Sequence, residues 1–194
     1  MSIERPSIRQ PLPPSAKKVF EGVLFDVYQW EQELYDGSKT IFEKLRRDDT
    51  VLVIPVLPDK RLLLNEDEQP GREPILTFPT GRMEKGETPE SAALRELHEE
   101  TGYITDELVF WKAIQPQTKM DWVIYFFIGR NCRKEGAAHA DAGERISTST
   151  ITFEEMLALT DDSRYRNQDL ILEFVEARYD AKKRAALEKL LFGE

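Results

Sequence analysis

The chain has little cysteine and histidine, and it lacks long apolar runs. Cys132 is the only cysteine in 194 residues, so an intrachain disulfide is excluded and a reducing compartment, the cytoplasm, is the expected location. No apolar run approaches the roughly 18 residues that a transmembrane helix needs. The N-terminus is too polar and too rich in proline for a signal peptide. We therefore expect a soluble protein without a membrane partner.

Basic residues are outnumbered by acidic ones. The sequence has 27 Lys and Arg residues against 36 Asp and Glu residues, which gives a formal net charge of −9. This balance argues against a general binder of nucleic acids or anionic membranes. A phosphate-bearing ligand would have to be bound by a local set of cations. Because 40% of the residues are hydrophobic, the chain can bury a core, and one domain with appendages is expected.

A helix is predicted over residues 89–101 from its two ends. Thr88 can cap free N–H groups, Pro89 suits the first helical position, and Gly102 accepts the left-handed conformation that ends a helix. At about 100° per residue, three glutamates share one side of this helix and apolar residues share the other. The acidic side is Ala92, Glu96, Glu99 and Glu100, and the packing side is Ala93, Leu94, Leu97 and Thr101.

Three carboxylates on one helical turn call for cations. Like charges four residues apart cost only about tenths of a kcal/mol while they are solvated, but crowding them in a cleft raises their pKa values or demands a metal. Magnesium prefers carboxylate oxygens and keeps positions open for water and substrate phosphates. The alternative is a solvated face, which is the commoner role of an arbitrary Glu-rich helix. The shared register of Gly81, the Gly86-Glu87 turn, Pro89 and Gly102 favours the metal site.

Residues 81–103 resemble the signature of the Nudix hydrolase family, G-x5-E-x7-R-E-U-x-E-E-x-G-U, in which U is aliphatic. The matching residues are Gly81, Glu87, Arg95, Glu96, Leu97, Glu99, Glu100 and Gly102, and Tyr103 at the last apolar position is the departure. The resemblance implies that Mg²⁺, with Mn²⁺ as the alternative, is bound as two or three ions by Glu96, Glu99, Glu100 and the Thr80 carbonyl. Arg95, oriented by Glu87, would complete the catalytic set with Glu99 and Glu100.

Apolar runs separated by turns predict strands on both sides of this box. An antiparallel pair is expected around Asp36-Gly37, from residues 19–34 and 39–47. A second hairpin is expected from residues 51–57 and 61–66. Later elements are predicted as strands at 75–78, 108–114, 122–130 and 146–152, a short helix at 153–159, and a long helix from about 168 to 192.

The predicted organisation has four parts: a loose proline-rich arm at 1–18, antiparallel strands at 19–48, a catalytic core at 49–165, and a terminal helix at 166–194. The resemblance implies an α+β Nudix fold for the core. This fold is an α/β/α sandwich around a mixed sheet, here preceded by the antiparallel pair.

Outside the box, the chain has an early strand pair with an Asp-Gly turn, EQPGREPILTFPTGRM before the box, DAGERISTSTITFEEM after it, and a terminal helix. With these features, residues 20–180 resemble ADP-ribose and nucleotide-sugar pyrophosphatases in particular. That resemblance implies Mg²⁺-dependent hydrolysis of the diphosphate in a nucleoside diphosphate linked to a second group, X. The products would be a nucleoside monophosphate and phosphorylated X. In such relatives the early strands pack against a second subunit, so a homodimer is expected, with strands 19–48 as the dimerisation region.

Several residues outside the box are candidates for substrate contacts or proton transfer. The basic residues that could meet the diphosphate are Arg46, Arg47, Arg82 and Lys85, although each could instead be a surface charge. Trp30 could stack on the nucleobase, although it could instead be a core residue. Glu144 lies in a loop before a strand and is our choice for the general base or a further metal ligand, with Asp141 behind it.

Three other interpretations stay open. The same box could hydrolyse damaged nucleoside triphosphates, although the early strands argue against that because such enzymes are usually minimal domains. The fold could bind ADP-ribose or a nucleotide sugar without cleaving it, yet such sensors often lose box acids and none is missing here. The terminal helix could bind a protein partner, although its leucines are more simply core or dimer contacts.

Overall fold

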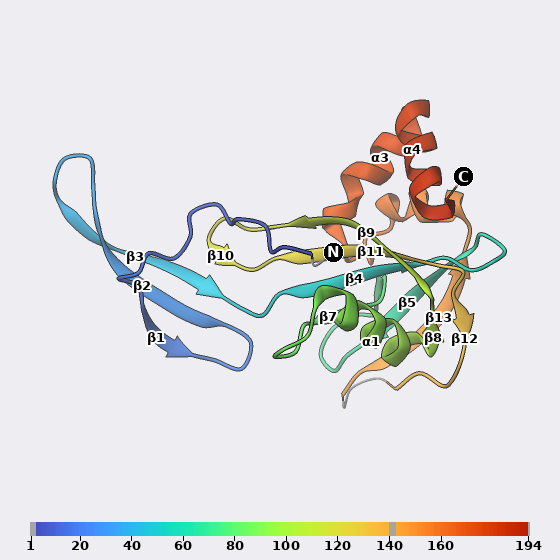
Figure 1. The fold of residues 1–194 in the computed structure, drawn as a ribbon, viewed down its shortest axis with the longest axis horizontal. Helices are drawn as coiled ribbons and strands as arrows, with labels where there is room; N and C mark the ends of the chain where they lie inside the picture. Colours follow the sequence, from blue (N-terminus) through green and yellow to red (C-terminus); the bar gives the residue numbers. More distant parts are fainter. Residues whose placement is uncertain (1–2, 140–142, 194) are drawn as a thin grey trace.

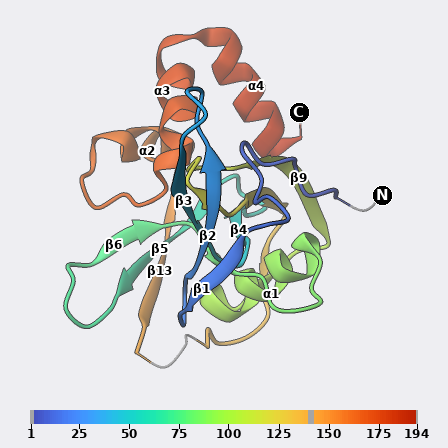
Figure 2. The ribbon, with the colours of Figure 1, turned by 90° about the vertical axis from the view of Figure 1, so that its left-hand side faces the viewer.

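Strand β4 (Thr50–Pro55) is buried along its whole length at the centre of the fold. Val51 packs toward helix α1 (Pro89–Thr101), whereas Leu52 packs toward the C-terminal helices. This alternation follows from strand geometry, since successive side chains point to opposite faces. Helices therefore cover both faces of the sheet, as the predicted α/β/α sandwich requires (Figure 1). Figure 2 shows the two helical layers on opposite sides of β4.

The computed structural model describes residues 3–139 and 143–193, and it contains two principal sheets in the body. Their strands are β5 (Leu62–Glu68), β6 (Ile75–Thr77), β7 (Thr80–Arg82), β9 (Glu107–Ile114), β11 (Ile124–Arg130) and β13 (Arg145–Ile151). The central sheet has the order β7–β4–β11–β9 and is mixed, as predicted, because β4 runs parallel to β11 and antiparallel to β7. The other sheet, β13–β5–β6, is antiparallel.

The predicted hairpin between residues 51–57 and 61–66 forms only at its turn. The Leu57 amide donates to the Arg61 carbonyl at 2.8 Å, and Val56 and Leu62 form an isolated bridge. Beyond this point β4 and β5 enter different sheets, so the prediction of a second hairpin was wrong in extent. The cause is non-local: each strand pairs with a partner that lies far away in the sequence.

The N-terminal strands form a separate sheet that projects from the body (Figure 1). It contains β1 (Lys17–Glu21), β2 (Asp26–Glu33) and β3 (Lys39–Arg46), joined by the short β10 (Met120–Asp121). The β2–β3 hairpin matches the predicted pair, and Gly37 in its turn has a φ of 82°. The run expected as one strand from residue 19 is divided, because the chain turns between β1 and β2.

The N-terminal arm lies against the body, contrary to the expectation that it would be loose. Arg5 forms ion pairs with Asp49 at 2.6 Å and with Asp121 at 2.8 Å. Ile3 and Ile8 pack on the same apolar cluster as α1. Ion pairs and apolar contacts therefore tie this proline-rich segment down, which its composition alone did not predict.

The single terminal helix predicted from residue 168 is instead two helices, α3 (Ile171–Tyr179) and α4 (Ala181–Phe192), after a short 3₁₀ turn. Asp180 separates them in an extended conformation, and its carboxylate accepts hydrogen bonds from the first amides of α4. With the predicted short helix α2 (Phe153–Ala158), they cover one face of the central sheet. Among the described residues, no helix combines the length and apolarity needed to cross a bilayer.

Candidate active site

Helix α1 begins and ends at the predicted residues, Pro89 and Thr101. The Thr88 hydroxyl accepts from the Ser91 amide at 3.2 Å, and Gly102 has a φ of 69°. Its packing face differs in one respect from the prediction. Ala92 is fully buried, whereas Leu94 is 39% exposed. The buried face is therefore turned toward the acidic side, which brings the glutamates close to the sheet.

Arg95 connects the acidic residues of the box through its guanidinium group. Its guanidinium donates to both carboxylate oxygens of Glu87, at 2.8 and 2.9 Å. It also donates to Glu96 at 2.7 Å and Glu99 at 2.9 Å. These bonds raise the pKa of Arg95, chiefly through Glu87, and hold the pKa of Glu87 below its usual value. Arg95 therefore joins the catalytic loop to the helix, as the resemblance implied for it and Glu87.

Gly81 lets the carboxylate of Glu96 lie directly over the backbone of β7. A Cβ atom at residue 81 would overlap that carboxyl group. Glu96 is only 9% exposed, so it has little room to move aside. The glycine that opens the box is therefore required by close approach of a side chain, and not by a positive φ.

Glu100 is the most perturbed acid of the site. Its Oε2 accepts from Asn65 Nδ2 at 2.8 Å, and its Oε1 lies 3.4 Å from the Thr80 amide. Burial, followed by the nearby charge of Glu96, raises the pKa of Glu100 well above its ordinary value, and the Glu144 charge adds to the rise. The two hydrogen bonds that it receives come from neutral groups, so they leave its negative charge without compensation.

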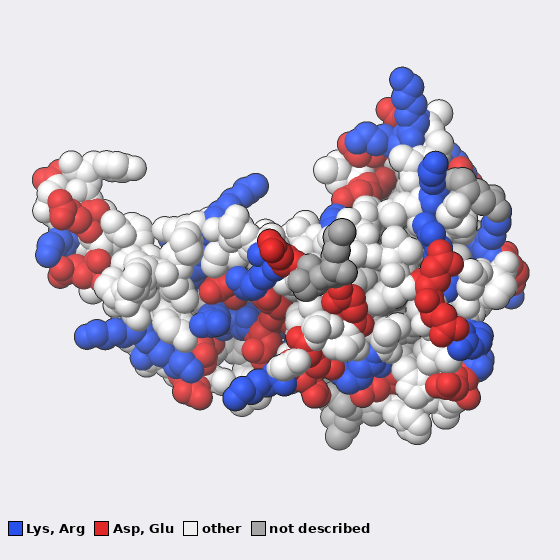
Figure 3. All heavy atoms as spheres, in the orientation of Figure 1, with Lys and Arg blue, Asp and Glu red and all other residues white. Residues whose placement is uncertain are grey.

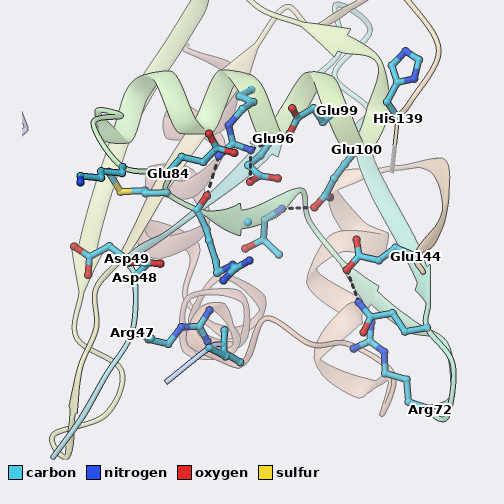
Figure 4. Close-up of a pocket in the computed structure, with 18 residues that line it drawn as sticks. Arg47, Asp48, Asp49, Arg72, Glu84, Glu96, Glu99, Glu100, His139 and Glu144 are labelled. Atoms are coloured by element: carbon cyan, nitrogen blue, oxygen red, sulfur yellow. Dashed lines mark hydrogen bonds and ion pairs between the residues drawn. The ribbon is translucent and has the colours of Figure 1, made fainter. Parts of the chain in front are cut away.

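Glu144, our candidate base, lies across the cavity from α1 (Figure 4). Its Oε1 accepts from Gln69 Nε2 at 2.6 Å. Gln69 follows β5, so the second sheet positions this acid. Asp141, the candidate behind Glu144, lies outside the described residues.

These groups face one open cavity of about 1070 Å³. Arg47, Arg72, Arg82 and Lys85 line it together with the carboxylates. Figure 3 shows the two signs of charge close together below the junction between the N-terminal strands and the body. An acidic protein thus has a local set of cations beside its carboxylates, which suits an anionic ligand that binds with a metal.

Some of the other residues proposed from the sequence line the cavity, and others lie outside it. Arg82 lines it. Arg46 does not; its side chain is 56% exposed and lies 4.0 Å from Asp121. The next residue, Arg47, faces the cavity instead. Trp30 is 6% exposed, packs edge-on against Phe42, and lies outside the cavity of this chain.

Sequence reasoning missed four residues that shape the site. Asn65, Gln69 and Arg72 come from β5 and the loop after it, and His139 lines the cavity from the loop before β13. Asn65 and Gln69 carry no local signal, because each matters only through a glutamate far away in the sequence. By contrast, Nε2 of His98 lies 3.4 Å from the carboxylate of Glu135, and His98 does not line the cavity.

The donor set fits a hard divalent cation in its chemistry. Carboxylate oxygens predominate, and the burial of Glu100 beside Glu96 favours a positive partner. Within residues 3–139 and 143–193, no three Asp, Glu, His or Cys side chains are grouped closely enough to form a ready-made metal cluster. Arg95 holds Glu96 and Glu99 in their present positions.

Comparisons with known proteins agree with this geometry. The model of the NUDIX domain matches residues 46–171, more than half of the chain. The chain is 29% identical to the ADP-ribose pyrophosphatase of Bacillus subtilis (strain 168), over 92% of this chain and 91% of that protein. It is 26% identical to the methanol dehydrogenase activator of Bacillus methanolicus, over 80% of this chain and 86% of that protein. A crystal structure of an ADP compounds hydrolase superposes with a TM-score of 0.71 at 22% identity, over 93% of this chain and 100% of that chain, which confirms the α+β fold. This chain belongs to the Nudix hydrolase family.

Proposed function

We propose that this enzyme hydrolyses the diphosphate bond of ADP-ribose or a similar nucleotide sugar, with AMP and ribose 5-phosphate as the products from ADP-ribose. The observation that carries the proposal is the cavity in which Glu96, Glu99, Glu100 and Glu144 lie beside several guanidinium groups. Similarity to an ADP-ribose pyrophosphatase along nearly the whole chain favours ADP-ribose as the first substrate to test.

Glu96, Glu99 and Glu100, with the carbonyl of Thr80, are the proposed ligands of two or three Mg²⁺ ions. Such ions neutralise phosphoryl oxygens and make water a better nucleophile at neutral pH. Burial, followed by the negative charge of Glu96, already raises the pKa of Glu100. Cation binding would relieve that repulsion, because opposite charge favours the ionised form of a carboxyl group.

The protein's own groups then handle substrate and protons. Glu144, held by Gln69, accepts a proton from the attacking water. Arg82 and Arg72 bind oxygens of the diphosphate from the cavity wall. Arg95 keeps the helix and the catalytic loop in register through Glu87. Water attacks one phosphorus and the bridging oxygen departs with the other phosphate, so no covalent enzyme intermediate is needed.

Chromatographic identification of products tests this proposal. ADP-ribose, UDP-glucose, GDP-mannose, NADH and nucleoside triphosphates are incubated with the full chain and Mg²⁺, with Glu100→Gln as the inactive control. We expect AMP and ribose 5-phosphate from ADP-ribose, and no product in excess chelator. Release of pyrophosphate from triphosphates alone would identify the damaged-nucleotide activity, and ADP-ribose binding without turnover would identify a sensor.

We also propose that β1–β3 hold two copies of this chain together. Phe20 is 59% exposed, Val23 98% and Ile41 61%, so the projecting sheet carries apolar side chains without cover in this chain. Light scattering after size-exclusion chromatography tests the assembly. Wild type should elute as a dimer and Ile41→Lys as a monomer. A monomeric wild type would refute the dimer without affecting the hydrolytic proposal.

A further inference from the structure

Arg47 lines the cavity and is held there by aromatic rings. Its guanidinium carbon lies 4.6 Å from the ring centre of Trp122 and 5.6 Å from that of Phe25. Its own amide donates to the Asp121 carbonyl at 3.3 Å. Contacts with two aromatic rings therefore restrain a group that would otherwise be a flexible surface charge.

A tight turn of the N-terminal sheet supplies one of these aromatic rings. The Gly22 amide donates to the Phe25 carbonyl at 3.1 Å, and a Cβ atom on Gly22 would lie 2.6 Å from that same oxygen. Glycine is thus needed to bring Phe25 back toward the body. Leu24, in the same turn, lines the cavity directly. The Gly22–Phe25 turn is therefore part of the cavity wall.

The described residues leave hydrogen-bonding capacity of the Arg47 guanidinium unused. Its Nε is buried without a hydrogen-bond partner in the described part of the chain. There, Arg72 pairs with Asp67 and Arg95 with Glu87, whereas neither Arg47 nor Arg82 has a carboxylate within ion-pair distance. Burial, followed by the charge of Arg82, lowers the pKa of Arg47, so the charged form is disfavoured where it stands. The charge of Asp48 opposes this effect only in part, so a bound anion would further stabilise the two neighbouring guanidinium groups.

The position of Arg47 in the cavity indicates which anionic group of a ligand it would contact. Figure 4 shows it across the cavity from Glu96, Glu99 and Glu100, with Arg72 and Glu144 nearer the opposite end. A phosphate held near Arg47 is thus separate from the carboxylate cluster. One guanidinium group can donate two parallel hydrogen bonds to two oxygens of a phosphate. We propose that Arg47, together with Arg82, binds the substrate phosphate that lies toward the N-terminal sheet. This inference rests on the proposed diphosphate substrate and adds a site to it.

Calorimetric titration of the full chain with inorganic pyrophosphate and Mg²⁺ tests the site without requiring turnover. Arg47→Gln should raise the Kd for pyrophosphate about tenfold, because a charge-assisted hydrogen bond is lost. Arg46→Gln is the matched control, since the neighbouring arginine points out of the cavity; its Kd should stay within about twofold of wild type. With ADP-ribose, Arg47→Gln should raise KM much more than it lowers kcat.

The control measurements separate binding from packing. If Arg47 only fills the space between Phe25 and Trp122, Arg47→Gln will lower the melting temperature and leave the pyrophosphate Kd unchanged, which would overturn the proposal. Absence of pyrophosphate binding by wild type would overturn it too. Should Arg47→Gln fail to fold, Arg47→Lys and Arg82→Gln must each weaken pyrophosphate binding. If wild type fails to release AMP yet its pyrophosphate binding depends on Arg47, the hydrolytic proposal fails and the phosphate site stands.

Discussion

Asn65 donates from Nδ2 to Oε2 of Glu100 at 2.8 Å, while its own Oδ1 accepts from the Thr148 hydroxyl at 2.9 Å. Asn65 on β5 and Thr148 on β13 are directly paired in the second sheet. Asn65 is fully buried. The hydroxyl fixes which end of the amide faces the carboxylate, so the antiparallel sheet orients an acid on a helix of the other layer.

Removal of that amide should weaken catalysis without abolishing the fold. Asn65→Leu leaves Glu100 with one weaker donor, and we expect kcat to fall about tenfold and the free energy of unfolding to fall by roughly 1.5–3 kcal/mol. Thr148→Val should have a smaller effect in the same direction, because the amide can then turn over. Thr150→Val, two residues along the same strand, is the control and should leave kcat within about twofold. Steady-state kinetics and urea unfolding measure both effects. The role of the Asn65 amide would be contradicted if Asn65→Leu kept the wild-type kcat and if Thr148→Val and Thr150→Val had equal kcat.

Glu100 itself should be essential for turnover. Glu100→Gln keeps the shape of the side chain and removes its charge, so we expect turnover at saturating Mg²⁺ to fall about tenfold or more. The far-ultraviolet circular dichroism spectrum should not change. Glu90→Gln in the first turn of α1 makes the same substitution outside the cavity and should retain activity. A Glu100→Gln enzyme as fast as wild type would remove this carboxylate from the mechanism.

In the presence of chelator, the free energy of unfolding should depend on pH differently in wild type and in Glu100→Gln. The pKa of Glu100 is raised in the folded chain, whereas in the unfolded chain it lies near the ordinary 4.5. As the pH rises above that value, the unfolded chain ionises first, so the wild-type free energy of unfolding decreases. Glu100→Gln lacks this loss. It should therefore be the more stable protein at pH 7, with the difference vanishing toward pH 4, as measured by urea unfolding at a series of pH values.

Gly81→Ala should damage the site through a single methyl group. The new Cβ would overlap the carboxyl of Glu96, which must then leave its place beside Arg95. We expect a loss of kcat of about tenfold or more and a fall in stability of about 1–3 kcal/mol, as for other overpacking changes. Gly136→Ala is a suitable control, because its Cβ would have only a contact of 3.8 Å to His98. Wild-type kinetics in Gly81→Ala would show that Glu96 need not lie there.

Glu144 and Gln69 should act as a pair. Glu144→Gln is expected to lower kcat about 10²-fold, the usual contribution of a general base, with little change in KM. Gln69→Leu removes the 2.6 Å bond that positions Glu144 and should lower kcat less. Arg145→Gln, which alters the neighbouring residue paired with Glu68, serves as the control. A pH–rate profile of Glu144→Gln that keeps the wild-type acidic limb would assign the base to another group.

The parts of the molecule that could be predicted from the sequence are those with local causes. The limits of α1 follow from Thr88, Pro89 and Gly102, each of which acts within one helical turn. The Arg95–Glu87 bond agrees with the signature, whose spacing is itself local. The boundary between α3 and α4 had a local signal that we overlooked, since Asp180 is a good N-cap residue within an otherwise helical pattern.

Contacts between distant segments could not be predicted in the same way. The alternation of side chains along a strand did not predict whether Arg46 or Arg47 faces the cavity, because the rings of Phe25 and Trp122 decide it. The separation of β4 from β5 likewise depends on later strands that pair with each of them. Nor did proline content indicate that Arg5 would meet the buried Asp121 and the partly buried Asp49.

The Gly22–Phe25 turn forms a part of the cavity wall that lies outside the segment carrying the box carboxylates. Leu24 lines the cavity and Phe25 contacts Arg47, while the hydrogen bonds described for Glu99 and Glu100 come from other parts of the chain. Exchange of this short stretch between related chains would therefore change which molecules are accepted while the hydrolytic machinery is inherited intact. Selectivity in this enzyme can evolve, or be engineered, by altering a few residues that precede the family signature by some sixty positions.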